Sequence, residues 1–352
     1  MKFEDVLVIK NGRNQRAVEN PQGRYPIYGS GGIMGYADDY ICKADTVVIG
    51  RKGSINNPLF VKEPFWNVDT AFGLEADRSV LLPKYLFYFC RHFDFERLNK
   101  AVTIPSLTKS DLLKIEIDVP DLRIQQSLVE RLSSIESIIQ LRKQQLVELD
   151  NLVKARFVEL FGDKRYPEDT LLNLCNIIDY RGKTPEKVES GLPFITAKNV
   201  RMHQMNLEPR EYISKETYDK VMVRGFPREG DVVFTTEAPL GNVCRIPHFD
   251  TEFYIGQRIV TMQTEKLEPI YLEYALSSDD FKTKYMGKSS GSTVTGIRVR
   301  LLEQLTIPVP PRELQKQFAA FVEQNDKSKA VVQKALYEAR TLFDSLMQQY
   351  FG

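Results

Sequence analysis

Two long stretches of the chain contain no proline or glycine and carry apolar residues at heptad spacing. The first extends from about Asp121 to Phe161, and the second follows Val309-Pro310 and ends at Phe351. Steps of three, four and seven residues between apolar positions are typical of a helix that buries one face. We therefore predict two helices of about 40 residues, each about 60 Å long.

Either helix alone would expose its apolar stripe to water, at about 1.5–3 kcal/mol for each large aliphatic side chain. The simplest solution is that the two helices pack antiparallel on each other. The alternative is that each helix folds back on its own globular neighbour. The residues predicted to pack are Leu132, Ile135, Ile139, Leu146, Leu149 and Val153 in the first helix and Phe318, Phe321, Val332, Leu336 and Phe343 in the second.

The segments before each helix show a different pattern, with short apolar runs between Gly, Pro, Asn and Asp. Runs such as 46–49, 115–117 and 232–234 predict strands. Residues 83–93 and 269–281 have helical character. These segments are therefore predicted to be mixed αβ modules, and the fold class is α+β.

The chain repeats itself once. A shift of 186 positions, from Asp45 to Asp231, also pairs 83–88 with 269–274; further on the shift is 190, from Val119 to Val309, and pairs Phe161-Gly162 with Phe351-Gly352. A small drift of this kind is what loop insertions produce. The repeat predicts four parts, namely modules at 1–118 and 163–308 and helices at 119–162 and 309–352.

Composition changes this picture little. The 352 residues carry a net charge of +1, so bulk charge does not favour a nucleic-acid partner. There is no apolar run of eighteen residues, and the acidic start Met1 to Asp5 lacks an apolar signal core. The four cysteines lie far apart, a pattern typical of reduced thiols, so we expect a cytoplasmic protein.

The motifs of common catalytic sites are absent from the sequence. There is no Walker loop, no Asn/Asp-Pro-Pro-aromatic loop, and no ligand spacing among the three histidines. Asp231 with Glu237 resembles a magnesium pair, but Asp231 precedes a predicted strand in both repeats, which favours a role in a turn. The glycine-rich run 29–35 departs from a nucleotide-binding loop at Met34 and predicts a tight surface turn. We expect no catalysis, no metal and no cofactor.

Local charge is more informative than the total. A basic, acid-free segment rich in Ser, Thr and Gly occurs at 282–300, and its counterpart in the first repeat, at 97–110, is also basic and free of acidic residues. Such loops suit contacts with phosphates and base edges. The predicted DNA-binding residues are Arg51, Lys52, Arg97, Lys100, Lys109, Arg181, Lys183, Lys198, Lys282, Lys284, Lys288, Ser292, Arg298 and Arg300.

Taken together, the order of module, Val-Pro, long helix and Phe-Gly, twice over, resembles the specificity subunits of type I restriction-modification systems. The segments 25–33, 66–72, 105–112 and 307–311, the last followed by Leu314-Gln315, carry the resemblance. Asp121 departs from it, because a second proline is expected at the first junction.

The resemblance implies that each module is a target-recognition domain that reads one half of a split double-stranded DNA sequence. It also implies that the helices fix the gap between the halves and dock two methyltransferase subunits, which would bind S-adenosylmethionine. Separate restriction subunits would cut and translocate the DNA. Two other functions remain open from the residues alone: a coiled-coil scaffold that binds no DNA, and a nuclease or methyltransferase without a recognisable motif.

Overall fold

The computed structural model describes residues 1–99, 104–162, 166–180, 182, 184–291 and 295–352. The chain forms two compact units. The first unit contains Met1–Gln145 and Val332–Gly352, and the second contains Leu146–Val331. None of the described helices is both long and apolar enough to span a membrane.

The first unit is built on an antiparallel sheet with strand order β1-β7-β4-β5. One of its two central strands, β4, is buried along its whole length, as its unbroken apolar run requires. The strands are β1 (Leu7–Asn11), β4 (Thr46–Gly50), β5 (Leu59–Val61) and β7 (Ala71–Ala76).

A smaller sheet in the same unit has the order β3-β2-β6, in which β2 and β3 are antiparallel and β2 and β6 are parallel. The bounds are β2 (Tyr25–Gly29), β3 (Gly32–Ala37) and β6 (Trp66–Asn67). The glycine-rich run forms the tight turn between β2 and β3, as predicted; Gly32 there has φ +121°, which favours glycine.

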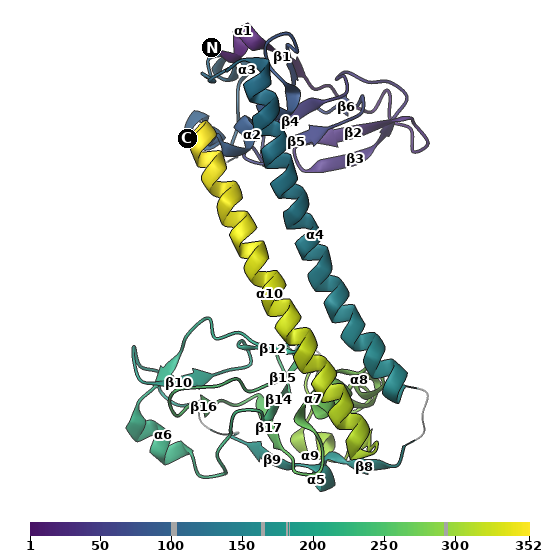
Figure 1. The fold of residues 1–352 in the computed structure, drawn as a ribbon, viewed down its shortest axis with the longest axis vertical. Helices are drawn as coiled ribbons and strands as arrows, with labels where there is room; N and C mark the ends of the chain where they lie inside the picture. Colours follow the sequence, from purple (N-terminus) through teal and green to yellow (C-terminus); the bar gives the residue numbers. More distant parts are fainter. Residues whose placement is uncertain (100–103, 163–165, 181, 183, 292–294) are drawn as a thin grey trace. The chain divides into compact units, whose positions relative to one another are not determined.

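Short helices complete the first module. Helix α2 packs over the sheet through Tyr85, Leu86 and Phe89, which are part of the core (Figure 1). The bounds are α1 (Phe3–Val6), α2 (Pro83–His92), the 3₁₀ helix η1 (Phe95–Leu98) and α3 (Lys109–Leu112).

The second unit repeats this plan. Its main sheet has the order β9-β17-β14-β15, which is the order β1-β7-β4-β5 with each strand replaced by its repeat partner. The small sheet β13-β10-β16 has the same mixture of antiparallel and parallel pairs as β3-β2-β6. The bounds are β9 (Asn176–Asp179), β10 (Leu192–Ile195), β13 (Tyr212–Ile213), β14 (Val232–Thr235), β15 (Val243–Arg245), β16 (Tyr254–Ile255) and β17 (Ile259–Gln263).

The remaining elements of the second unit are short helices and two small ribbons. The ribbons pair β11 with β12 and β8 with β18. The bounds are β8 (Glu168–Thr170), α5 (Leu171–Leu174), β11 (Val200–Arg201), β12 (Gln204–Met205), α6 (Lys215–Val221), α7 (Pro269–Ser277), α8 (Asp279–Met286), α9 (Val299–Leu302) and β18 (Thr306–Pro308).

The two predicted long helices are α4 (Leu122–Phe161) and α10 (Arg312–Phe351), and each contributes to both units. In the first unit the beginning of α4 shares a core with the end of α10, through Leu128, Leu132 and Phe343. In the second unit the end of α4 shares a core with the beginning of α10, where the rings of Phe157 and Phe318 are 5.4 Å apart. The pair is therefore antiparallel, as predicted.

The same junction holds each module to its long helix. The amide of Gln125 accepts a hydrogen bond from Leu82 N (2.8 Å) and donates to Pro120 O (2.7 Å). Gln315 accepts from Glu268 N (2.9 Å) and donates to Pro310 O (2.8 Å). Both glutamines are buried, and both reach the N-cap of the helix that follows the main sheet. A buried, bonded amide is costly to disturb, so these junctions are stiff.

Two sequence predictions need correction. Residues 115–117 form no strand; Glu116 makes only an isolated bridge with Lys2, whereas the equivalent residues of the second unit form β18. The stretch 269–281 is not one helix, because it breaks at Ser278, whose hydroxyl caps the new helix α8 by accepting from Phe281 N (3.2 Å).

Candidate nucleic-acid interface

In the first unit a group of backbone hydrogen bonds forms at the end of strand β4. Arg51 N donates to Thr70 O (2.8 Å), and Leu107 N donates to Arg51 O (2.9 Å). Lys52 and Ser106 form an isolated bridge. The side chains of Arg51 and Lys52 are exposed on this frame. We call this group the first strand-end site; it consists of Arg51, Lys52, Thr70, Ser106 and Leu107.

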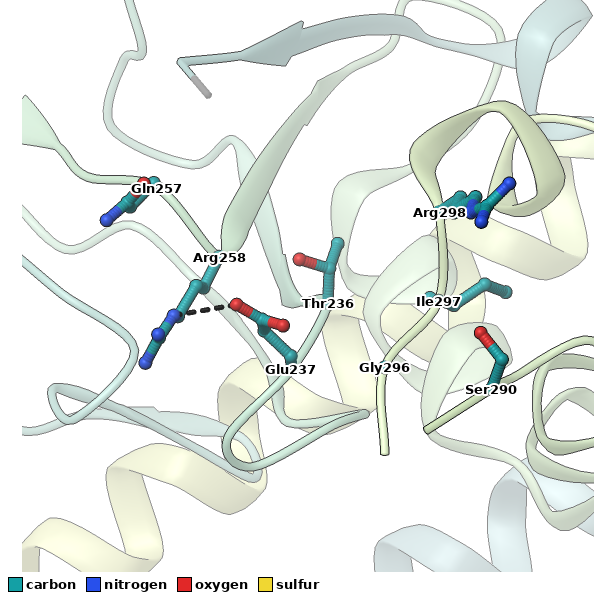
Figure 2. Close-up of a pocket in the computed structure, with 8 residues that line it drawn as sticks. All are labelled: Thr236, Glu237, Gln257, Arg258, Ser290, Gly296, Ile297 and Arg298. Carbon is teal, nitrogen blue, oxygen red and sulfur yellow. Dashed lines mark ion pairs between the residues drawn. The ribbon is translucent and has the colours of Figure 1, made fainter. Parts of the chain in front are cut away.

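The second unit has the same frame at the end of β14. Thr236 N donates to Arg258 O (2.8 Å), and Ile297 N donates to Thr236 O (2.9 Å). Glu237 and Gly296 form the matching bridge. These segments surround a hollow of about 230 Å³, the second strand-end site, lined by Thr236, Glu237, Gln257, Arg258, Ser290, Gly296, Ile297 and Arg298 (Figure 2).

An ion pair lies at the rim of the second strand-end site. Arg258 Nε is 2.7 Å from Glu237 Oε1, and both side chains are about half exposed. Figure 2 shows the two side chains facing each other, with Arg298 on the opposite side of the hollow. Gln257 Nε2 donates to Thr184 Oγ1 (2.6 Å). Cations, a carboxylate and an amide therefore line one accessible recess.

The predicted cations of the first module that the structure describes have three different surroundings. Arg51 and Lys52 are exposed at the first strand-end site, with the Arg51 guanidinium 5.7 Å from the Phe72 ring. Arg97, in η1, is exposed and 3.7 Å from Asp94. Lys109, at the start of α3, donates to Ile9 O (2.9 Å), so its ammonium is partly engaged.

In the second module four of the predicted cations are exposed in the stretch 282–300, part of which borders the hollow. Arg298 lines it as the N-cap of α9, and Arg300 lies within that helix. Lys282 lies on α8, and Lys288 follows its end. Lys198 is exposed in the turn after β10, apart from this group in sequence.

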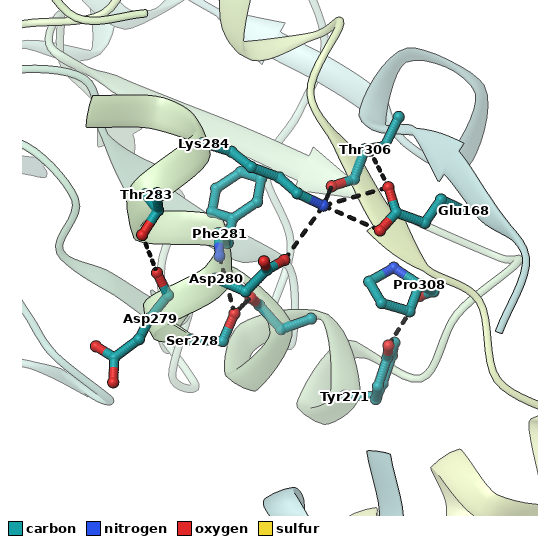
Figure 3. Close-up of polar contacts among 11 residues, drawn as sticks. Glu168, Tyr271, Ser278, Asp279, Asp280, Phe281, Thr283, Lys284, Thr306 and Pro308 are labelled. Carbon is teal, nitrogen blue, oxygen red and sulfur yellow. Dashed lines mark hydrogen bonds and ion pairs between the residues drawn. The ribbon is translucent and has the colours of Figure 1, made fainter. Parts of the chain in front are cut away.

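Lys284 is the exception. Its ammonium lies 3.1 Å from Glu168 and 3.2 Å from Asp280, and it also donates to Thr306 O (3.2 Å) (Figure 3). Burial alone would lower the pKa of Lys284, but its hydrogen bonds to Glu168 and Asp280 raise it. These contacts tie α8 to the β8–β18 ribbon, so Lys284 has few donors left for DNA and is omitted from the interface below.

Four predicted contact residues, Lys100, Arg181, Lys183 and Ser292, lie outside the described residues. Sequence reasoning missed Arg258 and Gln257, because they precede β17 in a segment without a basic cluster. The repeat was the signal that could have found them, since Thr70 occupies the position of Arg258 within the segment 66–72 already singled out.

Both residues of the suspected magnesium pair have partners within the protein, and Glu237 is paired with Arg258. Asp231 accepts hydrogen bonds from Arg228 N (2.7 Å) and Gln263 Nε2 (2.7 Å), which is the turn role predicted for it, and burial raises its pKa. Within the part of the chain that the structure describes, no group of three or more His, Cys, Asp or Glu is placed to hold a metal ion.

The residues predicted to pack the helices all lie on α4 and α10. Leu132, Val153, Phe318, Val332 and Phe343 are buried. Ile135, Ile139, Leu146, Leu149, Phe321 and Leu336 are partly buried. Other large apolar residues of the same helices, such as Leu141 and Tyr337, are exposed.

Comparison with known proteins supports the same interpretation. The family model described as the type I restriction modification DNA specificity domain matches residues 1–151 and again 169–338. A putative MjaX specificity subunit of Methanocaldococcus jannaschii is 25% identical over 298 residues, which cover 74% of this chain and 67% of that protein. The MjaVIII specificity subunit of the same organism is 23% identical over 330 residues, covering 83% and 73%.

Solved structures show the same fold. The S subunit of a type I restriction-modification system from M. genitalium aligns with a TM-score of 0.65 at 17% identity, over 100% of this chain and 95% of that one. A chain from a study of assembly of the type I system aligns with a TM-score of 0.61 at 18% identity, over 100% and 96%. Through the family match over both repeats, this chain belongs to the type I restriction-modification DNA specificity subunits, the non-catalytic subunits that recognise bipartite DNA targets within the complex.

Proposed function

We propose that each unit reads one half of the bipartite target with its strand-end site. The observation that carries this proposal is the repeated frame at the ends of β4 and β14, where the same backbone bonds present polar side chains to solvent. In this proposal residues 1–118 and 163–308 are the two target-recognition domains. Residues 119–162 and 309–352 are the spacer helices that set the gap between half-sites.

The charges near these sites suit a DNA backbone. Arg51 and Lys52 in the first unit, and Lys288, Arg298 and Arg300 in the second, are exposed. Contacts from such cations to phosphates supply affinity and hold the protein in register, whereas contacts to base edges supply specificity. We propose that these cations hold each strand-end site against the major groove of double-stranded DNA.

The partners proposed for the helices are two methyltransferase subunits, with restriction subunits joining the complete complex. Support comes from large apolar side chains that α4 and α10 expose: Leu141 at 64%, Val147 at 56%, Leu152 at 51%, Val158 at 59%, Val331 at 69% and Tyr337 at 72%. Exposed apolar side chains along a helix favour a protein partner. The chain itself would need no cofactor, and its free, buried thiols fit a cytoplasmic protein.

A salt series on duplex DNA tests the proposed interface. The double variant Lys288→Ala with Arg298→Ala should weaken binding and make the affinity less dependent on salt, because each lost phosphate contact lowers the slope by about one. The matched control is Lys215→Ala with Lys220→Ala, which removes two exposed charges from α6. Equal affinities and slopes for the two double variants would reject the interface.

Docking is tested separately by co-purification with the methyltransferase subunit. Leu141→Asp and Leu152→Asp should reduce co-purification strongly while duplex binding by the isolated chain persists. Leu172→Asp is the control, since Leu172 is 53% exposed but lies on α5. If the chain were a scaffold that does not bind DNA, the wild type and all variants would show no duplex binding in the salt series, while the wild type would still co-purify with its partners.

A further inference from the structure

The two strand-end sites share a backbone frame but carry reversed charges. The bridge Lys52–Ser106 matches Glu237–Gly296, so Glu237 occupies the position of Lys52. The bond Arg51 N to Thr70 O matches Thr236 N to Arg258 O, so Arg258 occupies the position of Thr70. The strand end is therefore basic in the first unit, whereas in the second it is acidic and faces an arginine.

A carboxylate next to DNA needs an explanation, because phosphates repel it. Glu237 lines the same hollow as Arg298, on the opposite side of it, and its bridge partner Gly296 belongs to the basic segment 295–300 (Figure 2). A carboxylate at such a surface is favourable where a cation neutralises it or where it accepts a hydrogen bond from a base, as Glu does from cytosine N4. Its acidity thus favours a base contact over a phosphate contact.

The neighbouring arginine completes this chemistry. Arg258 Nε is 2.7 Å from Glu237 Oε1, and this contact leaves the outer nitrogens of the guanidinium and the second carboxylate oxygen for other partners. Guanidinium groups donate in pairs to guanine O6 and N7. In the major groove a G·C pair presents these two acceptors next to the cytosine N4 donor, which matches adjacent Arg and Glu side chains.

Stability alone does not account for the arrangement. An exposed ion pair contributes little to folding, and both side chains here are about half exposed. Arg258 has φ +76°, a conformation that few non-glycine residues adopt and that tends to occur at functional sites. The backbone thus holds the arginine toward Glu237 at a conformational cost.

We infer that Glu237 and Arg258 read one G·C base pair in the half-site of the second unit. Arg258 donates to guanine O6 and N7, and Glu237 accepts from cytosine N4. This inference rests on the proposed function of the strand-end site and adds the base pair that the site selects. The first unit, with Arg51 and Lys52 on the same frame, cannot offer this combination at these positions and reads a different half-site.

The test uses the complex of the chain with its methyltransferase partner. Methylome sequencing first gives the bipartite motif, and dissociation constants are then measured for the target duplex and for duplexes in which each base pair is replaced in turn. One G·C pair in one half should show a penalty of about 10–100-fold on replacement. In Arg258→Ala that penalty should fall to within about threefold, while penalties at the other positions stay unchanged.

Two further variants keep the result interpretable. Glu237→Gln should relax the same position partially, and Arg258→Lys, which retains charge and a long side chain, should relax it without loss of assembly. The matched control is Glu208→Gln with Arg210→Ala, another exposed ion pair of the second unit, at 2.9 Å. This control should leave all penalties unchanged.

Three outcomes would overturn the inference: a motif without a G·C pair in either half, a uniform loss of affinity at all positions in Arg258→Ala, or unchanged penalties in Arg258→Ala and Glu237→Gln. If penalties are unchanged but Lys288→Ala with Arg298→Ala still weakens binding, the interface stands and only the base-reading role fails. If both sets of variants behave as wild type, the proposed interface fails with it.

Discussion

The two units of this chain repeat each other most closely where they are buried and least where they face solvent. Gln125 and Gln315 make the same bonds at the two helix junctions. The hydroxyls of Tyr85 and Tyr271 both donate to the segment before the long helix, at Asp118 O (3.1 Å) and Pro308 O (2.8 Å). At the strand-end sites, by contrast, the same frame carries unlike side chains. Two domains of the same fold that recognise different DNA sequences need similar cores and different exposed side chains.

A second difference lies in how each module holds its helices. In the first unit Arg91 pairs with Glu136 of α4, and both side chains are about a third exposed. In the second unit Arg245 pairs with the buried Glu273 (2.7 Å) and reaches Asp326 of α10 (3.5 Å), while His203 also contacts Glu273 (2.8 Å). The second junction therefore buries more charge and depends more on its partners staying in place.

The largest difference in stability between equivalent variants of the two units is expected at the aromatic cores of the two helix junctions. Phe318→Ala should destabilise the chain by about 3–5 kcal/mol, because Phe318 is fully buried against Phe157, Phe161 and Tyr274. Phe343→Ala should cost less, since that ring lies nearer the surface, beside Tyr88 and Arg91. Denaturant unfolding measures both, with the exposed Tyr337→Ala as control. Equal losses in all three variants would contradict the assignment of these cores.

At the junction glutamines, by contrast, equivalent variants of the two units should lose the same amount of stability. Gln125→Leu and Gln315→Leu each leave backbone groups at a helix N-cap without a partner, at about 1–3 kcal/mol each. Unfolding curves should show losses that agree within about 1 kcal/mol. A loss confined to one variant would mean that the two junctions are not equivalent.

The smallest effect concerns the four cysteines, two in each unit. Burial raises the pKa of Cys42, Cys175 and Cys244 to about 12, and that of Cys90 still further. The folded thiols should therefore react slowly with iodoacetamide at pH 8 and rapidly once the chain is unfolded.

The same shifts set the direction of a pH effect. Folded pKa values above the unfolded ones favour the protonated, folded form. The contribution of the buried thiols to the free energy of unfolding is fully present below about pH 8.5 and is lost as the pH rises from there toward 12. Stability that rose over this interval would contradict burial of the thiols.

Much of the fold could be predicted from the sequence because its signals are strong ones. Forty residues of heptad pattern without Pro or Gly have few alternatives to a long helix, and a shifted self-match predicts a duplicated architecture directly. The strand prediction at 115–117 failed for a local reason, because a three-residue segment needs a partner of equal length, and Lys2 offers a single bridge. The break at Ser278 depends on one capping hydroxyl, which periodicity does not reveal.

The candidate site was less predictable, because charge in a sequence does not tell which cations are already paired. Lys284 looks the same as Lys288 along the chain, yet it is held by Glu168, a residue far from it in sequence. Arg258 belongs to no basic cluster and reaches the site only because β17 pairs with β14. Such residues are found by following the strand register, not the composition.

The central claim is that each unit reads its own half of one split DNA target, and methylome sequencing of cells with altered chains tests it directly. Deletion of the chain should remove one bipartite methylated motif. Arg51→Ala with Lys52→Ala should lower methylation of the motif without changing its base preference, because these cations contact phosphates, whereas Glu237→Ala with Arg258→Ala should relax the base preference in one half only. A continuous motif, or a single unit's variant that alters the base preference of both halves, would contradict the account.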